Sequence, residues 1–130
     1  MSISFLIGRK LGMTRVFDEL GSDFPVTILK AGPCFVTQIK TVEKDGYSSV
    51  QLGFQDKSDR HLKKAEKGHF EKAGVVPKCI LKEISTDNVN GIDPGQDVGA
   101  DIFEMGDLVT VSGISKGKGF AGHMKRHGFS

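Results

Sequence analysis

The strongest structural signal in this chain is the segment Asp45-Gly46-Tyr47-Ser48-Ser49-Val50-Gln51-Leu52-Gly53-Phe54-Gln55. Asp-Gly is a typical hairpin turn, because both residues tolerate a positive φ angle. After the turn, Val50, Leu52 and Phe54 alternate with glutamine and glycine. A period of two predicts a strand with one buried face. The segment therefore predicts an antiparallel hairpin whose second strand packs against a core.

Segments on both sides of this hairpin also favour strands. The strand candidates are residues 3–16 (interrupted by glycines), 24–30, 35–42, 78–85, 98–103 and 108–112. In the third of these, Phe35, Thr37 and Ile39 are expected on one face. Residues 61–73 are compatible with a helix but contain Gly68, so they predict one or two short helical turns. Short strands separated by glycine-containing turns are typical of a mainly β fold, either a small barrel or a sandwich.

Length and composition limit the possible classes of protein. A chain of 130 residues with 38% hydrophobic and 26% charged residues suits one folded domain and excludes disorder throughout. No apolar run approaches the ~20 residues that a membrane helix needs. The run Ile3–Ile7 is too short for a signal peptide, and Arg9 and Lys10 follow it instead of preceding it. Two isolated cysteines form no disulfide framework, so we expect a reducing cytoplasm.

Charge is unevenly distributed, although the net charge is only +2. Residues 57–82 carry eight basic and three acidic groups, whereas residues 83–114 carry seven acidic groups and no Lys or Arg. Residues 115–130 carry four basic and no acidic groups. A partner that responds to the local field would meet two positive regions. For residues 57–82, a merely solvated charged face is the alternative, and we expect the acidic stretch to face solvent or a neighbouring protein.

The final segment, residues 115–130, has no strand periodicity but suits RNA binding. Its cations are Lys116, Lys118, Lys125 and Arg126. Such cations neutralise phosphates and release counterions, and Phe120 and Phe129 offer rings that stack on bases. Glycines between them allow close approach of the backbone to another surface. A segment of this composition orders on an anionic partner; a flexible tail is the alternative.

Catalytic and metal chemistry find little support. Residues 117–122 match the pattern G-x-G-x-x-G, but the dinucleotide fold also requires an acidic residue about 20 positions on, and none follows Gly122. The four histidines have no metal-ligand spacing, and no nucleophile is paired with a base. We therefore expect no enzyme activity, no catalytic residue, no metal and no cofactor. A nucleotide-binding enzyme that uses the loop Gly117–Gly122 is the least favoured alternative.

Motifs along nearly the whole chain resemble those of one known family. They are Leu6–Phe17, Pro25–Thr27, Ala31–Cys34, Val36–Gln38, Asp45–Tyr47, Val50–Gly53 and Gly68–Val75. The most specific is Gly113-Ile114-Ser115-Lys116-Gly117-Lys118-Gly119-Phe120-Ala121-Gly122, followed by Lys125-Arg126. On these motifs the chain resembles the bacterial form of the universal large-subunit ribosomal protein L-three.

The resemblance implies a small translation-protein-type β-barrel with short helical turns and a basic, irregular extension. It also implies that the protein binds large-subunit ribosomal RNA, helps assembly and supports the region near the peptidyl-transferase centre without being the catalyst. The RNA contacts carried over from the family are Lys116, Gly117, Lys118, Gly119, Gly122, Lys125 and Arg126 in the extension, and Arg9, Lys10, Arg15 and His69 earlier in the chain. The composition of the final segment adds Phe120, as a ring that stacks on a base, and His127, as a hydrogen-bond donor.

These implications give a domain division. We expect residues 1–114 to form the barrel domain with a basic insertion near 57–78, and residues 115–130 to begin the RNA-penetrating extension. Because family members continue past Arg126, we expect either a fragment or a truncated gene product, with an incomplete barrel. The expected partners are ribosomal RNA and neighbouring large-subunit proteins on the cytoplasmic ribosome, without a membrane or a small-molecule substrate. An extra-ribosomal protein-binding barrel, working through its acidic stretch, is the alternative.

Overall fold

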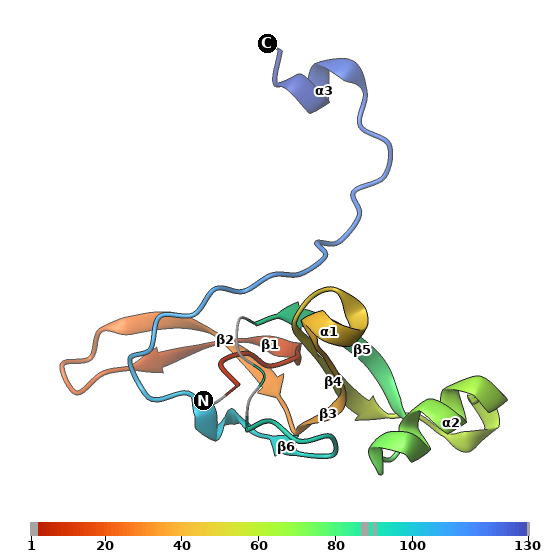
Figure 1. Cartoon of the computed structure of the whole chain (residues 1–130). Coiled ribbons are helices and arrows are strands. Elements are labelled where there is room, and N and C mark those ends of the chain that lie inside the picture. Colours follow the sequence, from red (N-terminus) through yellow and green to blue (C-terminus); the bar gives the residue numbers. More distant parts are fainter. Residues whose placement is uncertain (1–2, 87–88, 90, 130) are drawn as a thin grey trace.

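A computed structural model describes residues 3–86, 89 and 91–129, and it consists mainly of antiparallel strands (Figure 1). The strands are β1 (Gly8–Phe17), β2 (Asp23–Ala31), β3 (Cys34–Lys40), β4 (Ser49–Asp56), β5 (Lys78–Ser85) and β6 (Asp97–Val98). The helical elements are α1 (Val42–Asp45), η1 (Asp59–His61), α2 (Lys64–Ala73), η2 (Ala100–Ile102) and α3 (His123–His127). The mainly β fold predicted from the sequence is confirmed.

The strands form two open sheets instead of a closed barrel. One sheet has the order β5-β4-β3-β6, and β1 and β2 form a separate two-stranded ribbon. The predicted strand at 98–103 is wrong beyond Val98, where the chain turns into η2, and residues 108–112 form no strand. A strand persists only where a neighbour satisfies its backbone groups, and no described strand pairs with residues 108–112. The described residues therefore do not close a barrel.

The hairpin predicted around Asp45-Gly46 is present, but its connection is longer than a two-residue turn. After β3, the chain forms the single helical turn α1, which ends at Gly46 with a φ angle of 82°. The Gly46 N–H donates to the carbonyl of Val42 at 3.0 Å. Strands β3 and β4 then pair antiparallel, with Cys34 opposite Phe54. The Asp-Gly pair therefore predicted the left-handed residue correctly, because Gly46 adopts this conformation at the end of α1.

The core lies against one face of the four-stranded sheet. Val50, Leu52 and Phe54 are all buried, which confirms the alternation predicted for β4. The prediction that Phe35, Thr37 and Ile39 share one face of β3 is wrong in part, because Ile39 packs against the core on the same side as Cys34 and Val36. A bulge lies between Val36 and Gln38, so the alternation shifts at that point. The remaining buried core residues are Ile3, Ile92 and Val98.

Helix α2 runs through Gly68 without a break, so the predicted interruption is wrong. Phe70 and Ala73 are its buried residues, and packing of this face stabilises the helix. Gly68 is exposed and costs only about 1 kcal/mol relative to alanine. Gly74, with a φ angle of 67°, ends the helix, and its N–H donates to the carbonyl of Glu71 at 3.1 Å.

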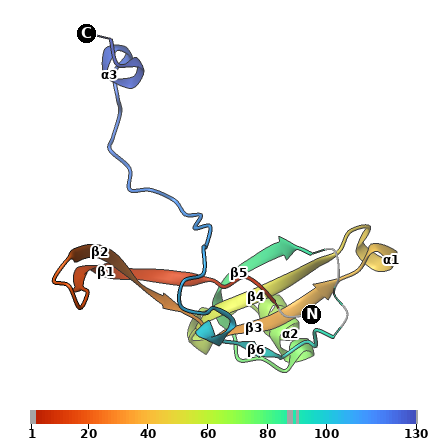
Figure 2. The ribbon, with the colours of Figure 1, turned by 90° about the vertical axis from the view of Figure 1, so that its left-hand side faces the viewer.

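The ribbon of β1 and β2 projects sideways from the sheet (Figure 2). It is exposed on both faces over most of its length. Its register shifts between Lys10 and Gly12, which leaves Leu11 as an extra residue. Because the ribbon buries little, its apolar side chains remain in contact with solvent. The most exposed of them are Leu11, Met13, Phe17 and Leu20.

Candidate nucleic-acid interface

The candidate interface is the C-terminal extension, predicted to begin at residue 115. Residues 108–114, which the sequence assigned to the barrel domain, continue into it without regular structure, so we define the extension as residues 108–129. Residues 108–122 have no regular secondary structure. Figures 1 and 2 show this segment rising away from both sheets to α3. The side chain of Ile114 is 103% exposed and that of Phe120 is 95% exposed. The extension is therefore exposed along nearly its whole described length. It was predicted to be irregular throughout, but it ends in the short helix α3.

The cations of the extension are uncompensated within the described chain. Five ion pairs are formed by the described residues. None of these pairs includes Lys116, Lys118, Lys125 or Arg126. The described part of the extension contains no acidic residue. Four cations without an internal counterion are suited to phosphates, since nothing inside the chain must be displaced first.

The glycines of the extension differ in backbone conformation, so glycine is favoured at each of them for a different reason. Gly119 has a φ angle of 75°, which disfavours other residues. Gly117 and Gly122 do not have a positive φ, and a Cβ atom added at either would meet nothing within 4 Å. Their small size therefore serves no packing within the described chain. Close approach of a partner to these two glycines stays a prediction.

Helix α3 carries a cluster of aromatic rings. The ring centroids of His123 and His127 lie 5.2 Å apart, and those of His123 and Phe129 lie 5.1 Å apart. His127 and Phe129 are 5.9 Å apart. The predicted site residue His127 thus belongs to an aromatic group with His123 and Phe129, whereas Phe120 has no ring neighbour in the described part of the chain. Only the four-residue spacing of the histidines hinted at this arrangement in the sequence.

The early candidates Arg9, Lys10 and Arg15 lie on the ribbon, apart from the extension. Arg9 is opposite Lys30 in the register, and Arg15 forms an ion pair with Asp23 at 3.3 Å. This pair is largely exposed, so it contributes little to stability and does not prevent contact with phosphate. The ribbon therefore presents a second, separate set of cations.

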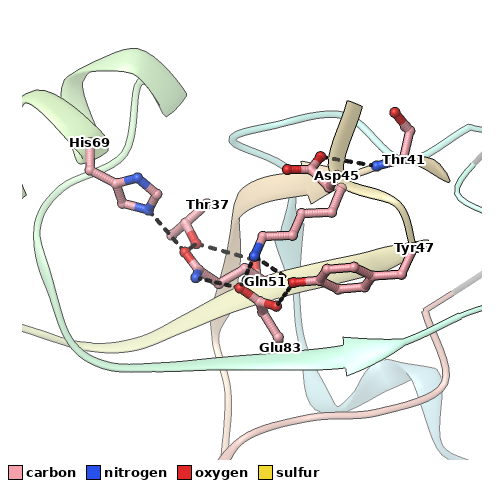
Figure 3. Close-up of polar contacts among 8 residues, drawn as sticks. Thr37, Thr41, Asp45, Tyr47, Gln51, His69 and Glu83 are labelled. Atoms are coloured by element: carbon pink, nitrogen blue, oxygen red, sulfur yellow. Dashed lines mark hydrogen bonds and ion pairs between the residues drawn. The ribbon is translucent and has the colours of Figure 1, made fainter. Parts of the chain in front are cut away.

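His69, another candidate, takes part in a polar network on the sheet (Figure 3). Its Nε2 atom lies 2.9 Å from Oε1 of Gln51, and Thr37 donates to the same oxygen at 2.8 Å. The Nε2 atom of Gln51 lies 3.4 Å from Oε1 of Glu83. These contacts link α2 to β3, β4 and β5. His69 is thus engaged inside the chain, which gives it a structural role beside its predicted RNA contact.

An ion pair between Lys40 and Glu83 lies at the other end of this network. The Lys40 ammonium lies 2.8 Å from Oε1 of Glu83, and Tyr47 donates to Oε2 of the same carboxylate at 2.9 Å. Hydrogen bonds to Glu83 and then Tyr47 raise the pKa of Lys40 above its ordinary range. The same contacts, led by Lys40, lower the pKa of Glu83. Both groups are therefore held in their charged forms across the neutral range.

The basic face of α2 was not assigned to the site from the sequence, although the charge count of residues 57–82 pointed to it. At 100° per residue, Lys64 lies on the side of the helix opposite Ala73, whereas Lys67 lies on the flank next to Phe70. Both lysines are exposed. Glu71 lies 3.9 Å from Lys67 and partly offsets this charge. At the start of the helix, Glu66 binds Lys57 at 2.9 Å, and this contact lowers the pKa of Glu66.

The topology argues against the nucleotide-binding alternative. All described strand pairs are antiparallel, whereas the dinucleotide fold requires parallel strands joined by a helix. Residues 117–122 lie in the extended segment and not between a strand and a long helix. Among the described residues, no group of three or more His, Cys, Asp or Glu side chains is placed to hold a metal ion. Nor is any helix in the described part of the chain long and apolar enough to cross a membrane.

Comparison with known proteins gives a consistent picture. No protein-family model matches the chain. The chain is 52% identical over 124 residues to the large ribosomal subunit protein uL3 of Brachyspira hyodysenteriae. It is 50% identical over 124 residues to that of Carboxydothermus hydrogenoformans, and 51% identical over 128 residues to that of Corynebacterium diphtheriae. These matches cover 95–98% of the chain but only 57–59% of the relatives, so the chain spans less than two thirds of their length.

Proposed function

We propose that this chain, which belongs to the family of the large ribosomal subunit protein uL3, is a structural component of the large subunit and binds ribosomal RNA directly. The family is the one that its motifs predicted. The proposal includes help in subunit assembly and support of the region near the peptidyl-transferase centre. The observation that carries it is the extension, which combines four uncompensated cations with an exposed backbone held away from the sheets.

The mechanism is electrostatic and steric. The described residues before 108, with both sheets and α2, form the folded part of the chain, which we call the body. The extension reaches outward from it by up to about 50 Å if residues 108–122 are fully extended. Lys116, Lys118, Lys125 and Arg126 neutralise phosphates and release counterions. Gly117 and Gly122 allow the backbone to pass close to packed RNA. The basic face of α2 supplies a second contact, and the ribbon cations a third.

The test is the salt dependence of RNA binding. With a fragment of large-subunit ribosomal RNA as the probe, four phosphate contacts from the extension predict a slope of about −3 in a plot of log affinity against log salt, at ~0.7–0.9 per contact. Replacing all four cations by glutamine should make the slope shallower by about 3 and leave the contribution of α2 and the ribbon. The matched control is Lys44→Gln on α1, a single cation on the body, and its slope should stay within one unit of the native value.

Two outcomes would contradict the proposal. A flat salt dependence of the native chain would mean that phosphate contacts do not drive binding. Failure to co-sediment with large ribosomal subunits, together with capture of a protein partner through residues 83–114, would favour the extra-ribosomal alternative.

A further inference from the structure

We propose that the aromatic cluster of α3 is a stacking platform that binds one unpaired nucleobase of RNA. The platform consists of His123, His127 and Phe129. This inference rests on the proposed function and adds a ligand class to it: an unstacked base, recognised by its π-face, in addition to phosphate. The three ring centroids lie within 5.1–5.9 Å of one another.

The local sequence explains why the rings gather. His123 and His127 are four residues apart, so they lie on one side of the helical turn. Gly128 has a φ angle of 65°, and this left-handed residue turns the chain back. The N–H of Phe129 then donates to the carbonyl of Met124 at 3.1 Å. The backbone therefore delivers Phe129 to the two histidines, and the cluster does not depend on contacts with the sheets.

The platform is open to a ligand. No residue of α3 is buried, and Phe129 is 58% exposed although it touches both histidines. The interplanar angles lie between 33° and 57°, so the rings do not cover one another face to face. Phe120 has no ring neighbour among the described residues. A ring already held by its neighbours loses less freedom on binding than an isolated one, so we assign the stacking to Phe129.

The charges of α3 complement a stacked base. At 100° per residue, Lys125 lies on the opposite side of the helix from the histidines, and Arg126 lies between the two sides. A base on the aromatic side therefore leaves both cations free to reach the phosphates of flanking nucleotides. Sequence-tolerant binding of single strands typically combines such stacking with a positively charged path for the backbone.

The experiment compares two probes of equal charge: an eight-nucleotide RNA of adenosines and an abasic ribose-phosphate strand of the same length. The full chain should bind the adenosine strand about 5- to 100-fold more tightly, as expected for stacking of one base. Phe129→Leu should abolish most of this preference without changing the salt slope, because leucine removes a ring and no charge. Gly128→Ala should weaken the preference by straining the turn that positions Phe129.

Met124→Leu is the matched control: it changes an exposed apolar residue of the same helix and should keep the full preference. Phe120→Leu tests the competing assignment of the stacking to the isolated ring of the extension. The platform is overturned if Phe129→Leu keeps the preference, or if Phe120→Leu alone loses it. Salt-dependent binding with equal affinity for both probes would also overturn the platform while leaving the proposed function intact. Loss of salt-dependent binding to both probes would overturn the proposed function and the platform together.

Discussion

Strand β4 and the extension contain similar apolar side chains, but they use them in opposite ways. Leu52 in β4 is completely buried, whereas Leu108 in the extension is fully exposed. The difference lies in their neighbours: β4 has a paired strand on each side, and residues 108–122 have none among the described strands. The sheet thus buries its apolar side chains internally, while the extension leaves its apolar side chains exposed.

The largest effect should come from truncating the same residue type in the two regions. Leu52→Ala should lower the free energy of unfolding by about 2–5 kcal/mol, because it leaves a cavity in the core. Leu108→Ala should change it by less than about 0.5 kcal/mol, as an exposed substitution does. Urea denaturation of both variants measures the difference. A clear loss of stability in Leu108→Ala would mean that the extension packs against the body.

A glycine pair gives the next largest effect. A Cβ atom added at Gly53 would lie 2.8 Å from Cγ of Lys78 and 3.0 Å from Cγ2 of Thr37. Gly53→Ala should therefore destabilise the chain by about 1–3 kcal/mol through overpacking. Gly117→Ala meets nothing within 4 Å and should leave stability unchanged.

The same two variants should reverse their order in RNA binding. If the backbone at Gly117 approaches RNA closely, Gly117→Ala should weaken affinity, measured at a temperature where both variants are folded. Gly53→Ala should bind like the native chain under those conditions, since its added methyl group lies inside the body. Equal affinity of Gly117→Ala and the native chain would remove close approach as the reason for this glycine.

The close packing at Gly53 was hard to predict from the sequence, because it depends on the burial of Lys78. Lys78 is only 6% exposed at its side chain, and its ammonium lies 2.6 Å from Oδ1 of Asp56 and 4.0 Å from the ring centroid of Phe35. Its stem crosses the face of β4 at Gly53. Lysine in an alternating strand pattern reads as a solvent-facing residue, so only the assembled sheet reveals that it is covered.

Local patterns predicted the parts of the fold that depend on local interactions. Alternation in Val50, Leu52 and Phe54 identified β4 and its buried face, and the glycine at Gly46 located the connection before it. The predicted break at Gly68 failed because burial of Phe70 holds the helix together, and the strand predicted at 108–112 failed because no neighbour pairs with it. Both failures concern contacts between distant segments, which local propensity does not contain.

The candidate site followed the same division. The sequence identified the cations of the extension, since composition alone distinguishes an uncompensated basic segment. It did not identify the aromatic cluster, because this depends on the turn at Gly128 that brings Phe129 back to His123. Nor did it show that His69 is held by Gln51, because that contact joins a helix to a strand.

A smaller effect should come from the ion pair of Lys40 and Glu83. Because the pKa of Glu83 is lowered in the folded chain, its stabilisation is present above its ordinary value of 4.5 and is lost as the pH falls through the folded value. The raised pKa of Lys40 gives stabilisation below its ordinary 10.5, which is lost as the pH rises through the folded value. Glu83→Gln should therefore be less stable than the native chain at neutral pH.

The pH profile separates this pair from general acid denaturation. The stability difference between Glu83→Gln and the native chain should stay constant from about pH 5 to 10 and shrink below pH 4.5, as measured by thermal denaturation. Glu43→Gln on α1 is the control, because Glu43 joins no ion pair among the described residues. A stability difference that does not change with pH would attribute the effect of Glu83→Gln to packing.

The smallest effect on stability should come from Glu71 on α2, where the body itself meets the proposed RNA surface. The pair with Lys67 spans 3.9 Å and is exposed, so Glu71→Gln should change stability by less than about 0.5 kcal/mol. It should nevertheless tighten RNA binding, because it removes a negative charge beside Lys64 and Lys67. Glu104→Gln, in the acidic stretch, removes the same charge away from both basic regions and should leave affinity unchanged. If the two variants tighten binding equally, RNA responds to net charge and not to the face of α2, and α2 would no longer belong to the proposed RNA surface.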